Sequence, residues 1–200
     1  MKKFKYLSLF LVICILISGC GSNSSEDDGG SNISISSKGV VTQKIRESFT
    51  ENYYDISELN NMILDEISAF NVENHDGDIK ATRVELTPDK ASTDVELVYV
   101  NGKAFSDYNG YKLFVGSGSE ALDAGFSLDV VLSSIKDATE TIGSADLNSS
   151  KNHILITDAM DTVYLPGKVK YISDNACVLE GQKAVKKKNE AEGLMYIVYK

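Results

Sequence analysis

The chain has 200 residues, with 20 basic and 29 acidic side chains and a net charge of −9. Such an acidic chain is poorly suited to bind nucleic acid or to adhere broadly to anionic lipid, because both attract positive charge. Residues 40–200, which follow an apolar N-terminus and a polar stretch, are long enough for one ordinary domain with its own core.

The first nineteen residues have the pattern of a secretory signal. Three lysines among the first five residues precede an apolar stretch over residues 6–18. That stretch is shorter than the roughly 20 residues that a membrane-spanning helix needs. It ends in Ile17-Ser18-Gly19-Cys20, an apolar residue and two small residues before a cysteine. The alternatives are an ordinary signal in which Cys20 is incidental, and an uncleaved anchor.

This ending resembles the lipobox of bacterial lipoproteins. The resemblance implies that residues 1–19 are removed and that the Cys20 thiol receives a diacylglyceryl group. The membrane is then a partner through that lipid, and the protein is expected on the outer face of the cell membrane. Two acyl chains suffice for stable anchoring, whereas one binds only marginally. Cleavage leaves 17 basic against 29 acidic residues, a net charge of −12, and Cys177 as the only other cysteine.

Residues 20–39 are rich in Gly, Ser, Asn and Asp, with Ile33 and Ile35 as their only sizeable apolar residues. Because such a segment buries too little apolar surface to offset ordering, it is predicted to be a disordered linker. A random coil of this length would hold the domain, residues 40–200, about 25 Å from the bilayer.

Apolar residues recur at intervals of three and four over residues 42–70, which predicts an α-helix. They are Ile45, Phe49, Tyr53, Ile56, Leu59, Ile63, Ile67 and Phe70. Asp55 and Glu58 have the spacing of a helix N-cap, so two helices with a break near Tyr54 are the alternative.

The remaining chain is predicted to consist mostly of strands. Residues 79–87 and 95–100 form a pair around a turn at Pro88-Asp89, and residues 111–115 form a further strand. A short helix follows, with a capping box at Ser117 and Glu120 and a terminating Gly125. The last strands span residues 154–157, 162–165, 169–173, 176–179 and 194–199, with tight turns at Asp174-Asn175 and Glu180-Gly181. These elements predict an α+β fold, an N-terminal helix (possibly two) packed on a mostly antiparallel sheet.

Two short motifs resemble elements of penicillin-binding proteins and serine β-lactamases. They are Ser133-Ser134-Ile135-Lys136 and Ser173-Asp174-Asn175, in which the resemblance implies a nucleophilic serine and a lysine that moves its proton. The third element of that family, K-T-G, does not occur after Asn175. A turn is therefore the favoured interpretation of Ser173-Asp174-Asn175.

Other polar clusters favour structural roles. Gly116-Ser117-Gly118-Ser119 resembles a phosphate-binding turn but lacks a full nucleotide motif, so a helix start explains it. Asn74-His75-Asp76-Gly77 resembles the middle of an EF-hand loop, yet both end ligands are missing. Asp158 and Asp161 are three residues apart after a strand, where acid–base chemistry, Ca²⁺ binding and turn formation are alternatives, with turn formation favoured.

The remaining reactive side chains are isolated. His75 and His153 have no Cys/His cluster around them, and Cys177 has no catalytic signature. Lys183 and the three lysines at 186–188 are expected in a solvated loop that could contact an anionic wall polymer or lipid head group. The sequence thus assigns no catalytic residue, no cofactor and no metal ligand. Cys20 is its only predicted site residue.

Three functional interpretations remain. The first is a membrane-tethered binding or interaction module that recognises a small ligand, a wall component or an envelope protein. The second is an envelope hydrolase that uses dispersed residues such as Ser133, Asp158 or Asp161. The third is an accessory subunit of an envelope complex. The lack of a catalytic motif favours the binding module.

Overall fold

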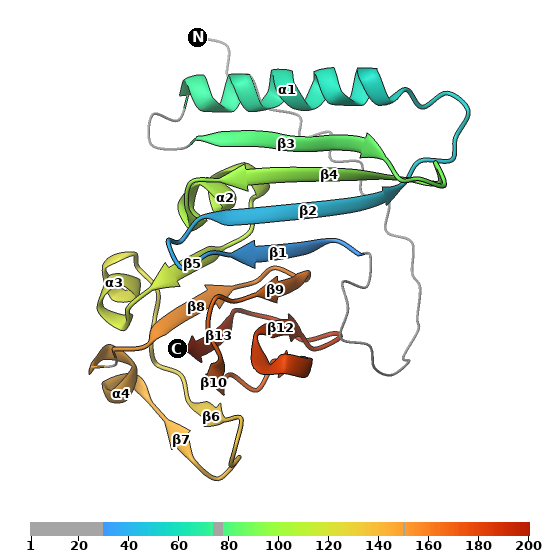
Figure 1. Ribbon diagram of the computed structural model, residues 1–200. Helices are drawn as coiled ribbons and strands as arrows, with labels where there is room; N and C mark the ends of the chain where they lie inside the picture. The colour runs from blue at the N-terminus through green and yellow to red at the C-terminus, as the bar shows by residue number, and fades with distance from the viewer. Residues whose placement is uncertain (1–29, 74–77, 150) are drawn as a thin grey trace.

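The computed structural model describes residues 30–73, 78–149 and 151–200, which form two β-sheets with helices packed against them (Figure 1). The architecture is α+β, as predicted. The helices within the described residues alternate with strands along the chain. The expectation of helices first and strands after is therefore wrong.

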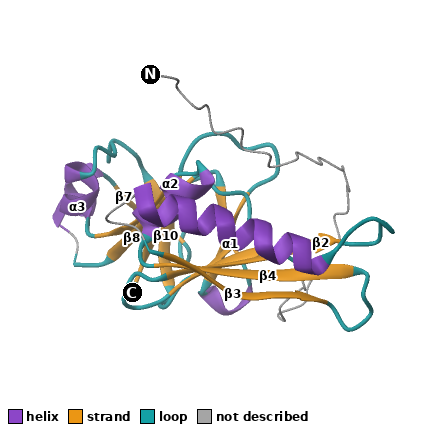
Figure 2. Ribbon diagram, turned by 90° about the horizontal axis from the view of Figure 1, so that it is seen from above, coloured by secondary structure: helices purple, strands orange, loops and turns teal. Residues whose placement is uncertain are grey.

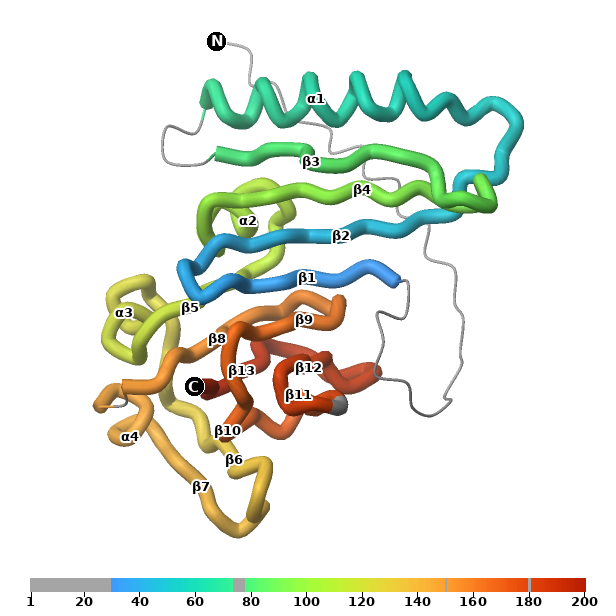
Figure 3. Tube along the Cα trace, in the orientation of Figure 1, coloured from blue at the N-terminus to red at the C-terminus, as the bar shows by residue number. Residues whose placement is uncertain are grey.

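The large sheet has seven strands, and all its neighbouring strands pair antiparallel except β1 and β9, which are parallel. In spatial order it contains β11 (Ala176–Val178), β12 (Ala184–Lys187), β9 (Thr162–Tyr164), β1 (Asn32–Ile35), β2 (Val41–Ser48), β4 (Ser92–Tyr99) and β3 (Ile79–Leu86). Figure 3 shows β1 between β9 and β2, so the sheet joins segments from both ends of the described chain.

The small sheet has six strands, all paired antiparallel. In spatial order it contains β5 (Leu113–Gly116), β8 (His153–Thr157), β13 (Met195–Tyr199), β10 (Val169–Ile172), β6 (Leu132–Ser134) and β7 (Thr141–Ile142). Its central strand β13 is buried along its whole length, because both faces of this sheet are covered.

Helices cover both sheets. The long helix α1 (Ile56–Glu73) runs alongside the edge strand β3 (Figure 2). The shorter α2 (Gly102–Asn109) packs on β4 and β5, and α3 (Gly118–Asp123) packs on α4 (Ser144–Ser149), β5 and β8. A 3₁₀ turn, η1 (Glu180–Gln182), connects β11 to β12.

The helix predicted over residues 42–70 is confirmed only in its second half. The α1 helix begins at Ile56, directly after the predicted N-cap Asp55, whose Oδ1 accepts hydrogen bonds from the backbone N–H groups of Ser57 (2.7 Å) and Glu58 (3.0 Å). The first half is wrong, because residues 41–48 form strand β2. The polar Gln43 occupies a buried position there and hides the strand alternation of the sequence.

The predicted linker over residues 20–39 is too long at its C-terminal end. Asn32–Ile35 form β1 inside the large sheet, and the side chains of Ile33 and Ile35 are buried in the core. The folded part therefore begins before residue 40. Residues 20–29 lie outside the described residues.

The other predicted strands are confirmed, with small shifts at their ends, as β3, β4, β5, β8, β9, β10, β11 and β13. The turn at Pro88-Asp89 joins the antiparallel pair β3 and β4, and Glu180-Gly181 joins the pair β11 and β12. Asp174-Asn175 forms the predicted turn, closed by a hydrogen bond from the backbone N–H of Ala176 to the carbonyl of Ser173 at 3.1 Å, but it connects strands of different sheets and does not form a hairpin. The lysine-rich loop expected around residues 183–188 is also wrong, because most of it is strand β12.

The two faces of the large sheet differ. Alternate residues of β4 are buried and face the main core, which both sheets and the helices α1 and α2 share. A second core lies between the small sheet and the helices α3 and α4. The opposite face of β2, β4 and β3 carries polar and charged residues and is left open. This open face holds the candidate site.

Candidate functional site

A hollow of about 50 Å³ lies on the open face of the large sheet, over β2, β4 and β3. Its wall contains three cationic and two anionic side chains, together with backbone and apolar atoms. The lining residues are Gly30, Lys44, Ile45, Arg46, Arg83, Asp94, Val95 and Glu96.

Strand register places these charges in two rows across the sheet. Lys44 of β2 lies opposite Glu96 of β4, which lies opposite Arg83 of β3. In the next row Arg46 lies opposite Asp94, which lies opposite Glu85. Because side chains on alternate positions of a strand share a face, all six project from the same side of the sheet.

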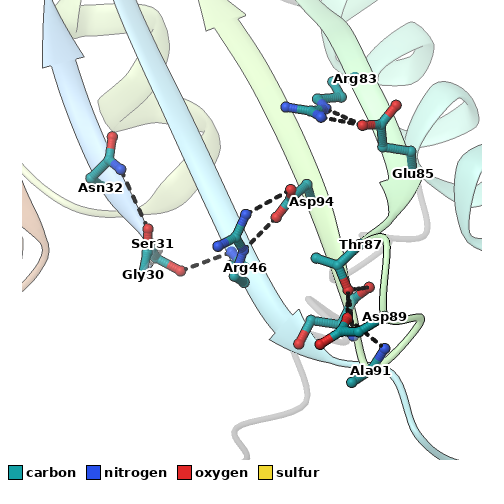
Figure 4. A network of polar contacts seen from close by, with 11 residues as sticks. Gly30, Ser31, Asn32, Arg46, Arg83, Glu85, Thr87, Asp89, Ala91 and Asp94 are labelled. Atoms are coloured by element: carbon teal, nitrogen blue, oxygen red, sulfur yellow. Dashed lines mark hydrogen bonds and ion pairs between the residues drawn. The ribbon is translucent and has the colours of Figure 1, made fainter. Parts of the chain in front are cut away.

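Hydrogen bonds and ion pairs fix the charged side chains (Figure 4). The Arg46 guanidinium donates from Nε and Nη2 to the two carboxylate oxygens of Asp94, at 2.6 and 2.8 Å. Arg83 donates to Glu85, from Nε at 2.6 Å. A bidentate arginine–carboxylate pair is both stronger and better oriented than a single contact. The Arg46–Asp94 pair therefore holds one wall of the hollow in place.

These contacts shift the pKa values of Asp94 and Arg83. The hydrogen bond from Arg46 lowers the pKa of Asp94 below its ordinary value, against the opposing effect of partial burial. The hydrogen bond to Glu85 raises the pKa of Arg83 further. Asp94 and Arg83 therefore stay charged at neutral pH. The hollow presents fixed charges, which suit recognition of a charged ligand better than proton transfer.

The first residues that the structure describes lie beside this hollow. The Ser31 hydroxyl accepts a hydrogen bond from the backbone N–H of Arg46 at 3.1 Å, and the Asn32 amide donates to the carbonyl of Gly30 at 3.3 Å (Figure 4). Gly30 itself lines the hollow. The first described residues, Gly30 and Ser31, therefore lie directly beside the cationic side chains.

The two motifs that resemble penicillin-binding proteins meet in the structure but serve its folding. Ser133 of β6 lies opposite Ile172 of β10, next to Ser173. The Ser173 hydroxyl accepts a hydrogen bond from the backbone N–H of Tyr196 at 2.9 Å and contacts the Asn175 side chain at 2.6 Å. The Ser134 hydroxyl accepts a hydrogen bond from the backbone N–H of Lys136 at 3.3 Å. The contacts of Ser134 with Lys136 and of Ser173 with Asn175 are local turn contacts, which supports the turn interpretation, and the bond from Tyr196 ties the end of β10 to β13.

The glycine-rich turn before α3 is the predicted helix start. The Ser117 hydroxyl accepts a hydrogen bond from the Glu120 backbone N–H, and the Glu120 carboxylate accepts one from the Ser117 backbone N–H at 2.7 Å. Gly125 follows the C-cap with a φ of +86°, a left-handed conformation that glycine adopts readily. The capping box and the terminating glycine are both confirmed.

The acidic pair Asp158 and Asp161 does not form a joint site with the hollow. The Asp158 carboxylate accepts a hydrogen bond from the backbone N–H of Lys112 at 2.7 Å and so closes the β5–β8 pair. Burial raises the pKa of Asp161, and the nearby Lys186 opposes that shift. No group of three or more potential metal ligands occurs in the described ranges. The EF-hand-like stretch at residues 74–77, with His75, lies outside them.

The remaining reactive residues are dispersed. His153 of β8 stacks on Tyr199, with ring centroids 5.6 Å apart. The Cys177 thiol of β11 contacts the carbonyl of Lys186 at 3.2 Å. Of the clustered lysines, Lys187 is buried and Lys188 donates to the carbonyl of Asp174 at 2.5 Å. None of these side chains lines the hollow.

Sequence reasoning missed the hollow. Its charged residues belong to strands that pair through register, and the apolar spacing over β2 predicts a helix instead. The one local signal is the i, i+2 spacing of like charges, Lys44 with Arg46 and Asp94 with Glu96, which puts each pair on one face of a strand.

Within the part of the chain that the structure describes, no helix is long and apolar enough to span a membrane. The predicted lipid-attachment residue Cys20 lies outside the described residues. Comparison of the chain with protein-family models, curated proteins and solved structures gives no match.

Proposed function

We propose that the protein is a lipid-tethered binding or interaction module of the bacterial envelope. Cys20 carries the anchor on the outer face of the cell membrane, and the open face of the large sheet makes the contact with a ligand or partner. The observation that carries the binding role is the charged hollow on that face. Its cationic and anionic side chains are pre-positioned by ion pairs, so a ligand meets an ordered surface.

The hollow favours a ligand that carries carboxylate or phosphate groups. Three of its lining side chains are cations, although the mature chain as a whole is strongly acidic. The lining charges sum to +1 on a strongly acidic chain, so an anionic group meets less repulsion at the hollow than over the average surface. Candidate ligands are therefore acidic peptides or anionic wall polymers.

Binding is tested by thermal unfolding of the full-length chain in detergent, with acidic peptides, teichoic acid fragments and neutral sugars as probes. A ligand that binds only the folded state at 100 times its Kd stabilises that state by about 2.7 kcal/mol. We expect a dose-dependent rise in Tm for an anionic probe, and its loss in the Arg83→Gln variant. A matched Lys80→Gln variant should keep the response, because Lys80 is exposed on the same strand but does not line the hollow.

The tether is tested separately. Growth of an expressing strain with labelled palmitate should label the wild-type chain and place it in the membrane fraction, and Cys20→Ser should abolish the label. Labelling of the Cys20→Ser variant, or no labelling of the wild type, would remove the lipid anchor from the proposal.

A further inference from the structure

The residues that precede the described chain carry a charge opposite to that of the hollow they adjoin. Glu26, Asp27 and Asp28 form an acidic triplet that ends two residues before Gly30. Gly30 lines the hollow, and Ser31 is held there by the backbone of Arg46. The triplet lies outside the described residues.

Chain length keeps the triplet close to the cations. A chain spans at most about 3.6 Å per residue, so the Cα of Asp28 lies within about 7 Å of that of Gly30 and the Cα of Glu26 within about 14 Å. Linkage through so few residues gives an effective concentration in the millimolar range. Even weak ion pairs are then formed for a large share of the time.

The charges of the hollow and of the acidic triplet have opposite signs. The residues that line the hollow are Lys44, Arg46 and Arg83 against Asp94 and Glu96, a net charge of +1, while Glu85, which pairs with Arg83, stands outside the lining. The triplet carries −3. We propose that Glu26-Asp27-Asp28 docks against the cations of the hollow as an intramolecular ligand. An external anionic ligand would then bind by displacing this segment.

Docking also alters the tether. With the triplet held at the hollow, only residues 20–25 remain between the lipid on Cys20 and the fold. A coil of six residues spans about 13 Å, against about 18 Å for the ten residues that reach Gly30. Release of the segment would let the domain stand further from the bilayer. This consequence rests on the proposed lipid anchor, whereas the docking itself does not.

The test is amide hydrogen exchange of residues 26–29 in the full-length chain in detergent, corrected for intrinsic exchange rates. The undocked reference is the variant Glu26→Gln/Asp27→Asn/Asp28→Asn. We expect exchange in the wild type to be slower than in this reference by roughly fivefold at low salt, the factor that surface ion pairs of ordinary strength supply. The difference should vanish at 1 M salt, where the screening length is about 3 Å.

Charge reversal identifies the docking surface. Lys44→Glu should remove the slow exchange, and Lys80→Glu, the same change on the same face outside the hollow, should preserve it. Asp27→Lys/Asp28→Lys added to Lys44→Glu should restore it. Unchanged slow exchange of the β4 amides shows that each variant is folded.

Three results would overturn the proposal: wild-type exchange equal to that of the reference, no effect of Lys44→Glu, or equal effects of Lys44→Glu and Lys80→Glu. If the segment is undocked but the peptide Ser-Ser-Glu-Asp-Asp-Gly-Gly raises the Tm when added in trans, the hollow serves external ligands and the proposed binding role stands. Cys20→Ser should leave the exchange unchanged, so a missing lipid label counts against the anchor alone.

Discussion

Gln43 and Tyr99 form a polar pair inside the core of the large sheet. The Tyr99 hydroxyl donates to Gln43 Oε1 at 2.7 Å and accepts from the Asn109 amide at 3.0 Å, and Tyr99 is fully buried. We expect Tyr99→Phe to lower the free energy of unfolding by about 1–3 kcal/mol, because it leaves the buried Gln43 acceptor without its donor. Urea denaturation of the full-length chain measures this loss.

Two further variants separate this effect from the loss of a hydroxyl in general. Gln43→Leu added to Tyr99→Phe should recover part of the stability, since the unpaired acceptor is then gone. Tyr171→Phe should change the unfolding midpoint little, because the hydroxyl of Tyr171 bonds to Glu140 at the surface. Equal losses for Tyr99→Phe and Tyr171→Phe would contradict the role of the buried pair.

At the scale of the element, α3 depends on its capping box because it has only six residues. Ser117→Ala removes the acceptor for the Glu120 backbone N–H and should cost about 1 kcal/mol of stability. Ser119→Ala is the control, since that hydroxyl contacts only the Ser117 hydroxyl, at 3.1 Å. Equilibrium unfolding by circular dichroism compares the two, and equal midpoints would show that the cap is dispensable.

The elements that could be predicted from the sequence are those in which the pattern of apolar and polar residues matches the pattern of buried and exposed side chains. The strand β4 alternates between the two faces along its length, and its sequence alternates with it. The strand β2 lacks this agreement, because the buried Gln43 breaks the alternation and Ile45 and Phe49 lie four residues apart, a spacing that predicts a helix. Contacts with distant residues such as Tyr99 stabilise β2 as a strand, and these contacts cannot be seen in the local sequence pattern.

The sequence around α2 contains a local helix signal. Asn101 is its N-cap and accepts a hydrogen bond from the Ala104 backbone N–H at 2.9 Å, and Gly110 ends the helix with a φ of +75°. An Asn before and a Gly after eight residues is a recognised pair of helix boundary signals. The strand β12 gives a weaker local signal, because lysines occupy four of the six positions from Lys183 to Lys188, including the buried Lys187, and such a run predicts a solvated loop.

At the scale of the whole molecule, pairing between distant strands creates both the fold and the candidate site. The parallel pair β1 and β9 joins residues about 130 positions apart in sequence, as in the register of Ile33 with Val163. The hollow needs Lys44, Glu96 and Arg83 in one row, which follows from the register of β2, β4 and β3. Sequence spacing indicates which residues share a face of one strand, but it does not indicate which strands become neighbours.

The two-sheet core also sets the response of the molecule to alkaline pH. Burial raises the pKa of Tyr199 to about 12 and raises the pKa values of Tyr99 and Tyr108 as well. In the unfolded chain a tyrosine ionises near pH 10. Above that pH the folded state therefore holds more protons than the unfolded state, and stability falls as pH rises.

We expect the free energy of unfolding to be fully retained below pH 10 and to fall between about pH 10 and 12, by up to roughly 1.4 kcal/mol per pH unit for each buried tyrosine. Phenolate absorbance at 295 nm should rise in two phases, with the second coinciding with loss of the near-ultraviolet circular dichroism. Tyr199→Phe should reduce the slope if the variant is folded at neutral pH. Complete phenolate formation with the circular dichroism intact would show that these hydroxyls are open to solvent in the folded protein, contrary to the burial of Tyr99 and Tyr199.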